Sequence, residues 1–171
     1  METQKDYEII SLGGNCQVRT YLTSRGLMKT KAQGRLSMPF DLASNPTDAI
    51  AQILDNENDY LDGLEYKFLN GPRRMLWQQP KYNSILSHDI DCGEDDREKI
   101  TERYRQRFKN LKNAIIKNDF IFFIHKAQGT TEDVNYLYAV LEKVCEKAEK
   151  ERKKERKKER KKGLQIDCVG Y

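Results

Sequence analysis

The chain has 171 residues, of which 37% are hydrophobic and 34% are charged, and its net charge is +4. This length fits one domain with a sizeable core, and no apolar run approaches the roughly 20 residues of a membrane-spanning helix. Residues 2–6 are polar, so no secretory signal is expected, and the four cysteines show neither CxxC nor zinc-type spacing. We therefore expect a cytoplasmic protein without a metal or another cofactor.

The positive charge is concentrated near the end of the sequence. Residues 149–162 contain ten Lys or Arg and four Glu, whereas the remainder carries a net charge of −2. Most of this run repeats Glu-Arg-Lys-Lys, and its period of four is close to that of an α-helix. We expect a single domain over 1–171 with a solvated helical extension at 149–162. Nucleic-acid binding by this run is less favoured, because it has no aromatic residue to stack on bases.

The stretch near the N-terminus combines a strand, a turn and a thiol. Residues 7–12 have the composition of a buried strand, which Gly13 and Gly14 end. Asn15 is placed to cap a helix that begins at Cys16. Free N–H groups and the helix dipole at such a position favour a thiolate, so Cys16 is a candidate nucleophile. Its N–H and the Asn15 amide are candidate oxyanion donors, and an unreactive, packed Cys16 is the alternative.

Shorter elements are expected in the next part of the chain. Gly26 is a suitable end for the first helix. The elements that follow are a short edge strand over 36–40, a helix begun by Asn45 and Pro46, a turn with a short helix or strand over 56–69, and two hairpin strands over 75–79 and 82–88.

A long amphipathic helix is predicted from Asp95 or Asp96 to 118–119. Its apolar residues recur at helical spacing, and they are Ile100, Tyr104, Phe108, Leu111 and Ile115. The continuous apolar run over 120–124 is typical of a strand that is buried on both faces.

The last predicted helix begins at Thr130, which with Asp133 forms a capping box. Gly163 is expected to end it before a final strand over 164–169. The resulting strand–helix–strand order predicts an α/β three-layer sandwich with a mostly parallel sheet and helices on both faces.

A thiol nucleophile needs a base, and the chain has only two histidines. His88 ends the predicted hairpin and is the preferred base. His125 follows the predicted central strand and is a competing candidate at the substrate-binding edge. Asp41 and Asp89 are the candidates to orient the imidazole of His88.

Several motifs carry a resemblance to a known family. They are Ser11-Leu-Gly-Gly-Asn-Cys16, Met38-Pro-Phe-Asp41, Ser87-His-Asp89, the helix over 103–108 and the apolar strand over 120–124. Over nearly its whole length the chain resembles the bacterial DUF1796 family, which is described as papain-like cysteine peptidases. The resemblance implies a Cys–His hydrolase with Cys16 as nucleophile and His88 as base. It also implies a papain-like α+β topology, which is the alternative to the three-layer sandwich.

Two features depart from that family's pattern. Leu42 stands where an aromatic residue often follows Pro-Phe-Asp, and the Glu-Arg-Lys-Lys repeat resembles an insertion. From the candidate thiol, the two histidines and the resemblance, we expect a thiol hydrolase that acts on an acyl or peptide bond. Peptidase, esterase, amidase and acyltransferase chemistry all stay open. The alternatives are a transferase that binds an anionic donor at the turn of Gly13 and Gly14, and a non-enzymatic binding module.

Overall fold

A computed structural model describes residues 7–69, 74–126 and 129–166, with side chains up to residue 158. The helices and strands, in chain order, are β1 (Tyr7–Ser11), α1 (Gln17–Ser24), α2 (Thr47–Asp55), α3 (Glu57–Asp62), β2 (Glu65–Leu69), β3 (Arg74–Gln79), β4 (Ser84–Leu86), α4 (Arg97–Lys117), β5 (Phe120–Ile124) and α5 (Thr131–Ile166). Short 3-10 turns occupy η1 (Lys31–Gln33), η2 (Pro80–Tyr82) and η3 (Glu94–Asp96).

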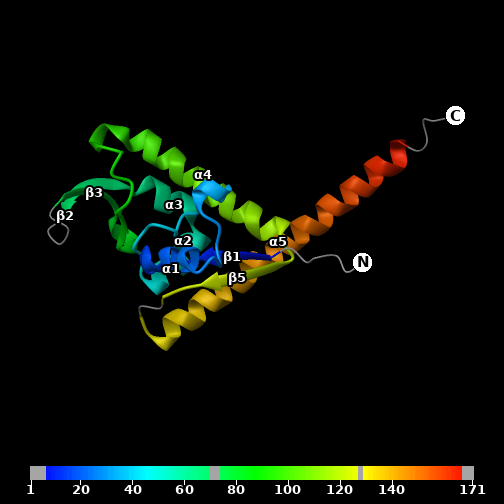
Figure 1. Cartoon of the computed structure of the whole chain (residues 1–171), viewed down its shortest axis with the longest axis horizontal. Coiled ribbons are helices and arrows are strands. Elements are labelled where there is room, and N and C mark those ends of the chain that lie inside the picture. Colours follow the sequence, from blue (N-terminus) through cyan, green and yellow to red (C-terminus); the bar gives the residue numbers. More distant parts are fainter. Residues whose placement is uncertain (1–6, 70–73, 127–128, 167–171) are drawn as a thin grey trace.

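The strands form two separate small sheets (Figure 1). β1 and β5 pair in parallel, from Tyr7 opposite Phe120 to Ser11 opposite Ile124. β2, β3 and β4 form an antiparallel sheet that contains the predicted hairpin. The mixed α/β class is therefore confirmed, whereas a three-layer sandwich is not confirmed. The expected strand over 36–40 is a loop, in which Pro39 has no N–H to donate to a sheet.

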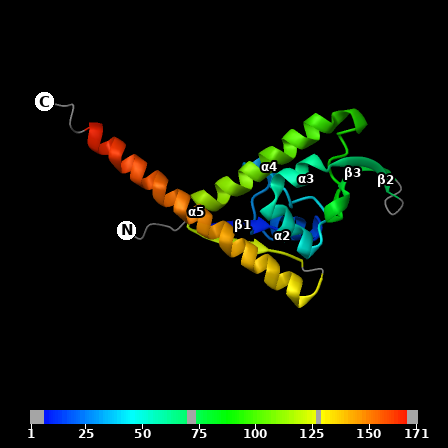
Figure 2. The same cartoon turned by 180° about the vertical axis from the view of Figure 1, so that it is seen from behind.

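One face of the β1–β5 pair lies on the main core. Ile10 and Phe123, which are opposite each other, contact this core, to which α2, α4 and α5 also contribute. Figure 2 shows α5 crossing this side of the pair. The other face carries Ile9, which packs on α1, and Phe122, whose exposed fraction is 53%. The prediction that β5 is buried on both faces is wrong, because α1 covers β1 and leaves the outer face of β5 open.

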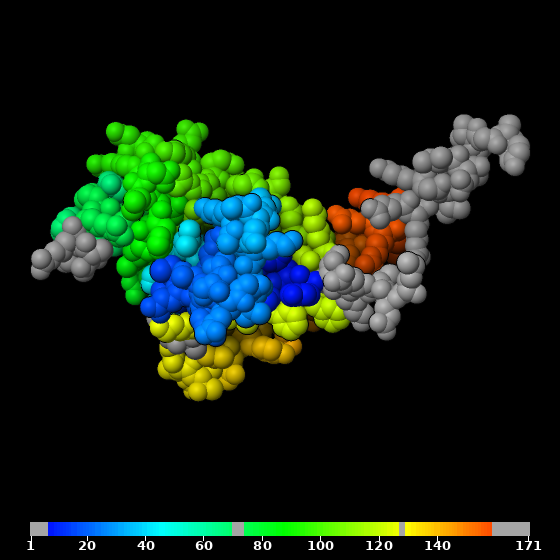
Figure 3. Space-filling model, in the orientation of Figure 1, coloured from blue at the N-terminus to red at the C-terminus, as the bar shows by residue number. Residues whose placement is uncertain are grey.

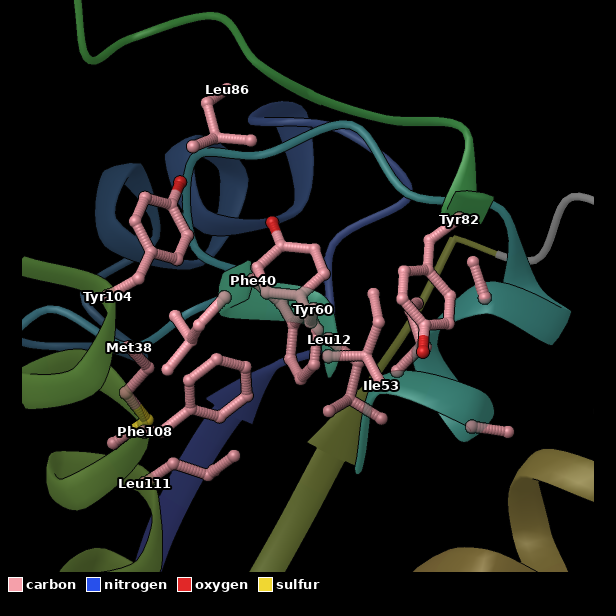
Figure 4. Close-up of a cluster of buried hydrophobic side chains, with 14 of the residues drawn as sticks. Leu12, Met38, Phe40, Ile53, Tyr60, Tyr82, Leu86, Tyr104, Phe108 and Leu111 are labelled. Carbon is pink, nitrogen blue, oxygen red and sulfur yellow. The ribbon is translucent and has the colours of Figure 1, made fainter. Parts of the chain in front are cut away.

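Aromatic side chains fill the centre of the core (Figure 4). Phe108 of α4 makes edge contacts with Phe40 and Tyr60, at centroid distances of 6.1 and 6.0 Å. All five residues of the predicted α4 stripe are buried, so the helical period read from the sequence is confirmed. The same packing holds the loop before α2 against α4, and this loop leads to the candidate site.

The last helix differs from the prediction at its far end. The capping box is present, since the Asp133 N–H donates to Thr130 Oγ1 and the Asp133 carboxylate accepts from the Thr130 N–H. α5 continues through Gly163 to Ile166, so the predicted helix end and the start of the strand over 164–169 are wrong. Residues 167–169 lie outside the described residues. The repeat consists of good helix formers, and a single glycine costs only about 1 kcal/mol.

The charged run is helical, as expected, but its first part is not simply solvated. Arg152 donates hydrogen bonds to the carbonyls of Ile115, Ile116 and Asn118, at distances between 2.6 and 2.9 Å. It thereby caps the C-terminal end of α4. Beyond it α5 projects away from the body (Figure 1). In the described part of the chain, no helix is long and apolar enough to cross a membrane.

Candidate functional site

The turn after β1 is built on two glycines with positive φ angles, +79° at Gly13 and +89° at Gly14. A Cβ at Gly14 would lie 2.5 Å from the carbonyl oxygen of Lys126, and one at Gly13 would lie 2.8 Å from that of Phe40. Only glycine therefore allows the end of β5 and the loop after Met38 to approach the turn so closely.

Cys16 lies where this turn becomes α1. It occupies the N-cap position and is half-buried, and the helix begins at Gln17, one residue later than predicted. Asn15 Oδ1 accepts the N–H of Gln17 at 2.9 Å, so Asn15 does satisfy the first helical donor. Within the described residues the Cys16 N–H has no acceptor. The thiol and a free N–H group thus occupy the same helix start, where a negative charge is stabilised.

His125 follows β5 directly and lies against the main chain of Leu12 and Gly13. Its Nε2 is 2.9 Å from the hydroxyl of Thr47, the first residue of α2. Its Nδ1 is buried and has no partner within hydrogen-bond distance and angle among the described residues. Burial lowers the pKa of His125, although the main chain of Gly13 and Leu12 acts in the opposite direction. A lowered pKa favours the neutral imidazole, which is the form that can accept a proton.

Further contacts join these segments at one edge of the β1–β5 pair. The Lys126 ammonium donates to Gln17 Oε1 at 3.0 Å, and the Lys126 N–H donates to Gly13 O at 3.4 Å. The Ser44 hydroxyl donates to Gly14 O at 3.3 Å. The start of α1, the end of β5 and the loop before α2 thus meet beyond the carboxyl ends of the two parallel strands, which is the edge that the sequence predicts for a site.

His88 lies elsewhere in the structure, on the exposed turn after β4. It lines an open pocket of about 490 Å³ together with Arg103 and Arg107 of α4. Cys16 does not line this pocket. The structure thus assigns the two histidines to different surroundings, and His125 is the one with direct contacts to the glycine turn.

Both candidate carboxylates are engaged by arginines. Asp41 Oδ2 accepts from Arg19 at 2.8 Å and from the Met38 N–H at 3.0 Å. Burial raises the pKa of Asp41 even though the charge of Arg19 opposes this. Within the described residues, neither Asp41 nor Asp89 forms a hydrogen bond or ion pair with the imidazole of His88. The expectation that one of them orients His88 is therefore not met, because each carboxylate has a cationic partner.

Asp89 is the centre of a buried charge cluster that the sequence analysis did not identify. Arg107 binds both of its oxygens, at 2.8 and 3.0 Å, and Arg103 and the Tyr104 hydroxyl bind it at 2.8 and 3.0 Å. Burial would raise the pKa of Asp89, but the hydrogen bonds and charge of Arg107 outweigh this effect and leave it lowered. Arg103 and Arg107 are four residues apart, so a helix places them on the same face, and this spacing was the signal that could have indicated a shared acidic partner.

Thr47 was also missed, because no local pattern links a hydroxyl at the start of α2 to a histidine that is 78 residues away.

Comparisons with models of protein families, with curated proteins and with solved structures find no match for this chain. The resemblance to the DUF1796 family thus stays a prediction. Among the described residues, no three His, Cys, Asp or Glu side chains are arranged to hold a metal ion.

Proposed function

We propose that the protein is a thiol hydrolase that uses Cys16 as its nucleophile on an acyl or peptide bond. The observation that carries this proposal is the position of Cys16 at the start of α1. Its N–H has no acceptor among the described residues, and the end of β5 is held against the same turn. A reactive thiol persists in a reducing compartment, so a cytoplasmic location belongs to this proposal.

The reaction follows from the groups present. A histidine takes the proton of the Cys16 thiol, and the thiolate attacks the acyl carbon. The Cys16 N–H and the Asn15 amide stabilise the oxyanion, and the imidazolium then protonates the leaving group. Water attacks the resulting thioester while the imidazole removes its proton, which releases the acid and restores the thiol.

Two imidazoles compete for the role of base. Sequence order and the resemblance favour His88, whereas the contacts of the glycine turn and a lowered pKa favour His125. We assign the base to His125, since it already lies at the edge where α1 begins. His88 lines a pocket to which Cys16 does not contribute.

The test is a screen of acyl-class electrophilic probes and esters, followed by variants. Cys16→Ser is expected to abolish thioester formation, and His125→Gln to slow turnover by about a hundredfold, the usual contribution of a general base. His88→Gln is the matched control and is expected to stay within about twofold. A larger loss in His88→Gln would reverse the base assignment. Full hydrolysis by Cys16→Ser would contradict the hydrolase proposal.

A transferase is the second candidate, because Lys126 and the N-terminal ends of α1 and α2 converge on one edge. Such an edge suits an anionic donor. Transfer would be favoured if hydroxylamine or an amine acceptor raised the rate of substrate turnover above the rate of hydrolysis without the acceptor. If no probe reacts at Cys16, the non-enzymatic binding module is the better proposal.

A further inference from the structure

β5 is an edge strand without the features that usually protect such strands. Between Ile121 and Ile124 its main-chain pairing is with β1. Phe122 and Ile124 have exposed fractions of 53% and 39%, and the strand contains neither a charge nor a proline. Figure 3 shows this part of the chain on the surface beside β1. An open, apolar edge of this kind is a template for another strand.

α5 runs back along the core face of β5 and then extends past the start of this strand (Figure 2). Arg152 binds the carbonyl of Asn118, two residues before β5 begins, so α5 has returned to the start of β5 by this point. A strand–helix–strand unit would normally turn here into its next parallel strand. Instead the helix continues to Ile166, and at 1.5 Å per residue it extends about 21 Å further.

The sequence beyond the repeat has the pattern of the missing strand. From 164 to 169 it reads Leu-Gln-Ile-Asp-Cys-Val, with apolar and polar residues alternating over the first five positions. By residue 164, α5 extends about 18 Å beyond Arg152, and this part of the helix projects away from the body (Figure 1). While α5 is helical up to Ile166, the 164–169 segment does not reach the edge of β5 in its own chain.

We propose that the 164–169 segment of a second copy adds to the outer edge of β5 over Ile121–Ile124, and that the exchange is reciprocal in a two-fold dimer. This exchange requires the end of α5 to unwind from Gly163, where a glycine weakens the helix. Each helical extension, with a charge of +6, then crosses to a partner body with a net charge of −2, which is electrostatically favourable. This strand exchange supplies each two-stranded sheet with a third strand. It is independent of the proposed hydrolase activity.

The test is the mass of the full chain by size-exclusion chromatography with light scattering at micromolar concentration. Ile166→Lys places a charge on the apolar side of the segment, and Gln165→Lys is the matched control on its polar side. Wild type and Gln165→Lys are expected to be dimers, and Ile166→Lys to dimerise at least about tenfold more weakly.

Hydrogen exchange of β5 identifies the contact itself. The β5 amides are expected to be protected in wild type and to exchange faster in Ile166→Lys, with α2 and α4 unchanged. A monomeric wild type would overturn the proposal, and so would dimers of equal strength in both variants. Protection of β5 in a monomer would assign the segment to its own chain and would overturn the exchange.

Discussion

Gly14 joins the two strand ends at the candidate site. Its φ of +89° is costly for other residues, and an added Cβ would meet the Lys126 carbonyl at 2.5 Å. Gly26 also has a positive φ, +69°, but nothing lies within 4 Å of the position of its Cβ. Substitutions at these two glycines can therefore be compared to distinguish the cost of the backbone conformation, which both share, from the cost of a steric contact, which only Gly14 has.

Gly14→Ala is expected to lower the free energy of unfolding by about 2 kcal/mol or more, because strain and the contact with Lys126 add. Gly26→Ala is expected to cost about 1 kcal/mol, from the backbone conformation alone. Urea unfolding of both variants measures this difference. Equal losses would show that β5 does not press on the turn as the structure indicates.

At the scale of elements, the turn after β4 is fixed to α4 by the charge cluster around Asp89. Asp89 and Arg107 are both buried, whereas Asp91, which also binds Arg103, is exposed by 59%. A buried charge that loses its partner is expensive, while an exposed pair contributes little. The two carboxylates therefore offer a matched comparison.

Asp89→Asn is expected to destabilise the protein by about 3 kcal/mol, since Arg107 keeps its charge in a buried position. Asp91→Asn is expected to cost less than about 1 kcal/mol. Since the pKa of Asp89 is lowered in the folded state, its contribution is present above the ordinary aspartate pKa and is lost as the pH falls below it. Unfolding free energies measured from pH 7 to pH 3 test both statements. An Asp89→Asn loss no larger than that of Asp91→Asn would contradict them.

For the whole molecule, local patterns were predictive and long-range pairing was not. The stripe on α4, the capping box at Thr130 and the glycine turn follow from residues within one or two helical turns, and the structure confirms them. The exposure of β5 depends on which strands and helices cover it, and the run of apolar residues at 120–124 does not encode this. The arginine partners of Asp41 and Asp89 are likewise 14 to 22 residues away in sequence.

Long-range contacts of the charged run at 149–162 could not be predicted from its sequence either. Its composition predicts a solvated helix, yet Arg152 binds three carbonyls at the end of α4. The sequence contains no signal that separates this arginine from the other arginines of the repeat. Its role arises only from the contact of α5 with the C-terminal end of α4, where the two helices cross (Figure 1).

The central claim, that Cys16 is a reactive nucleophile, is tested most directly by alkylation of the native protein. Burial raises the pKa values of Cys92 and Cys145, so these two thiols are internal references with little thiolate at pH 7. With limiting iodoacetamide and peptide mass spectrometry, Cys16 is expected to react at least about tenfold faster than either reference. In denaturant the three rates should become similar. Equal rates in the native protein, or a protected Cys16, would contradict the claim.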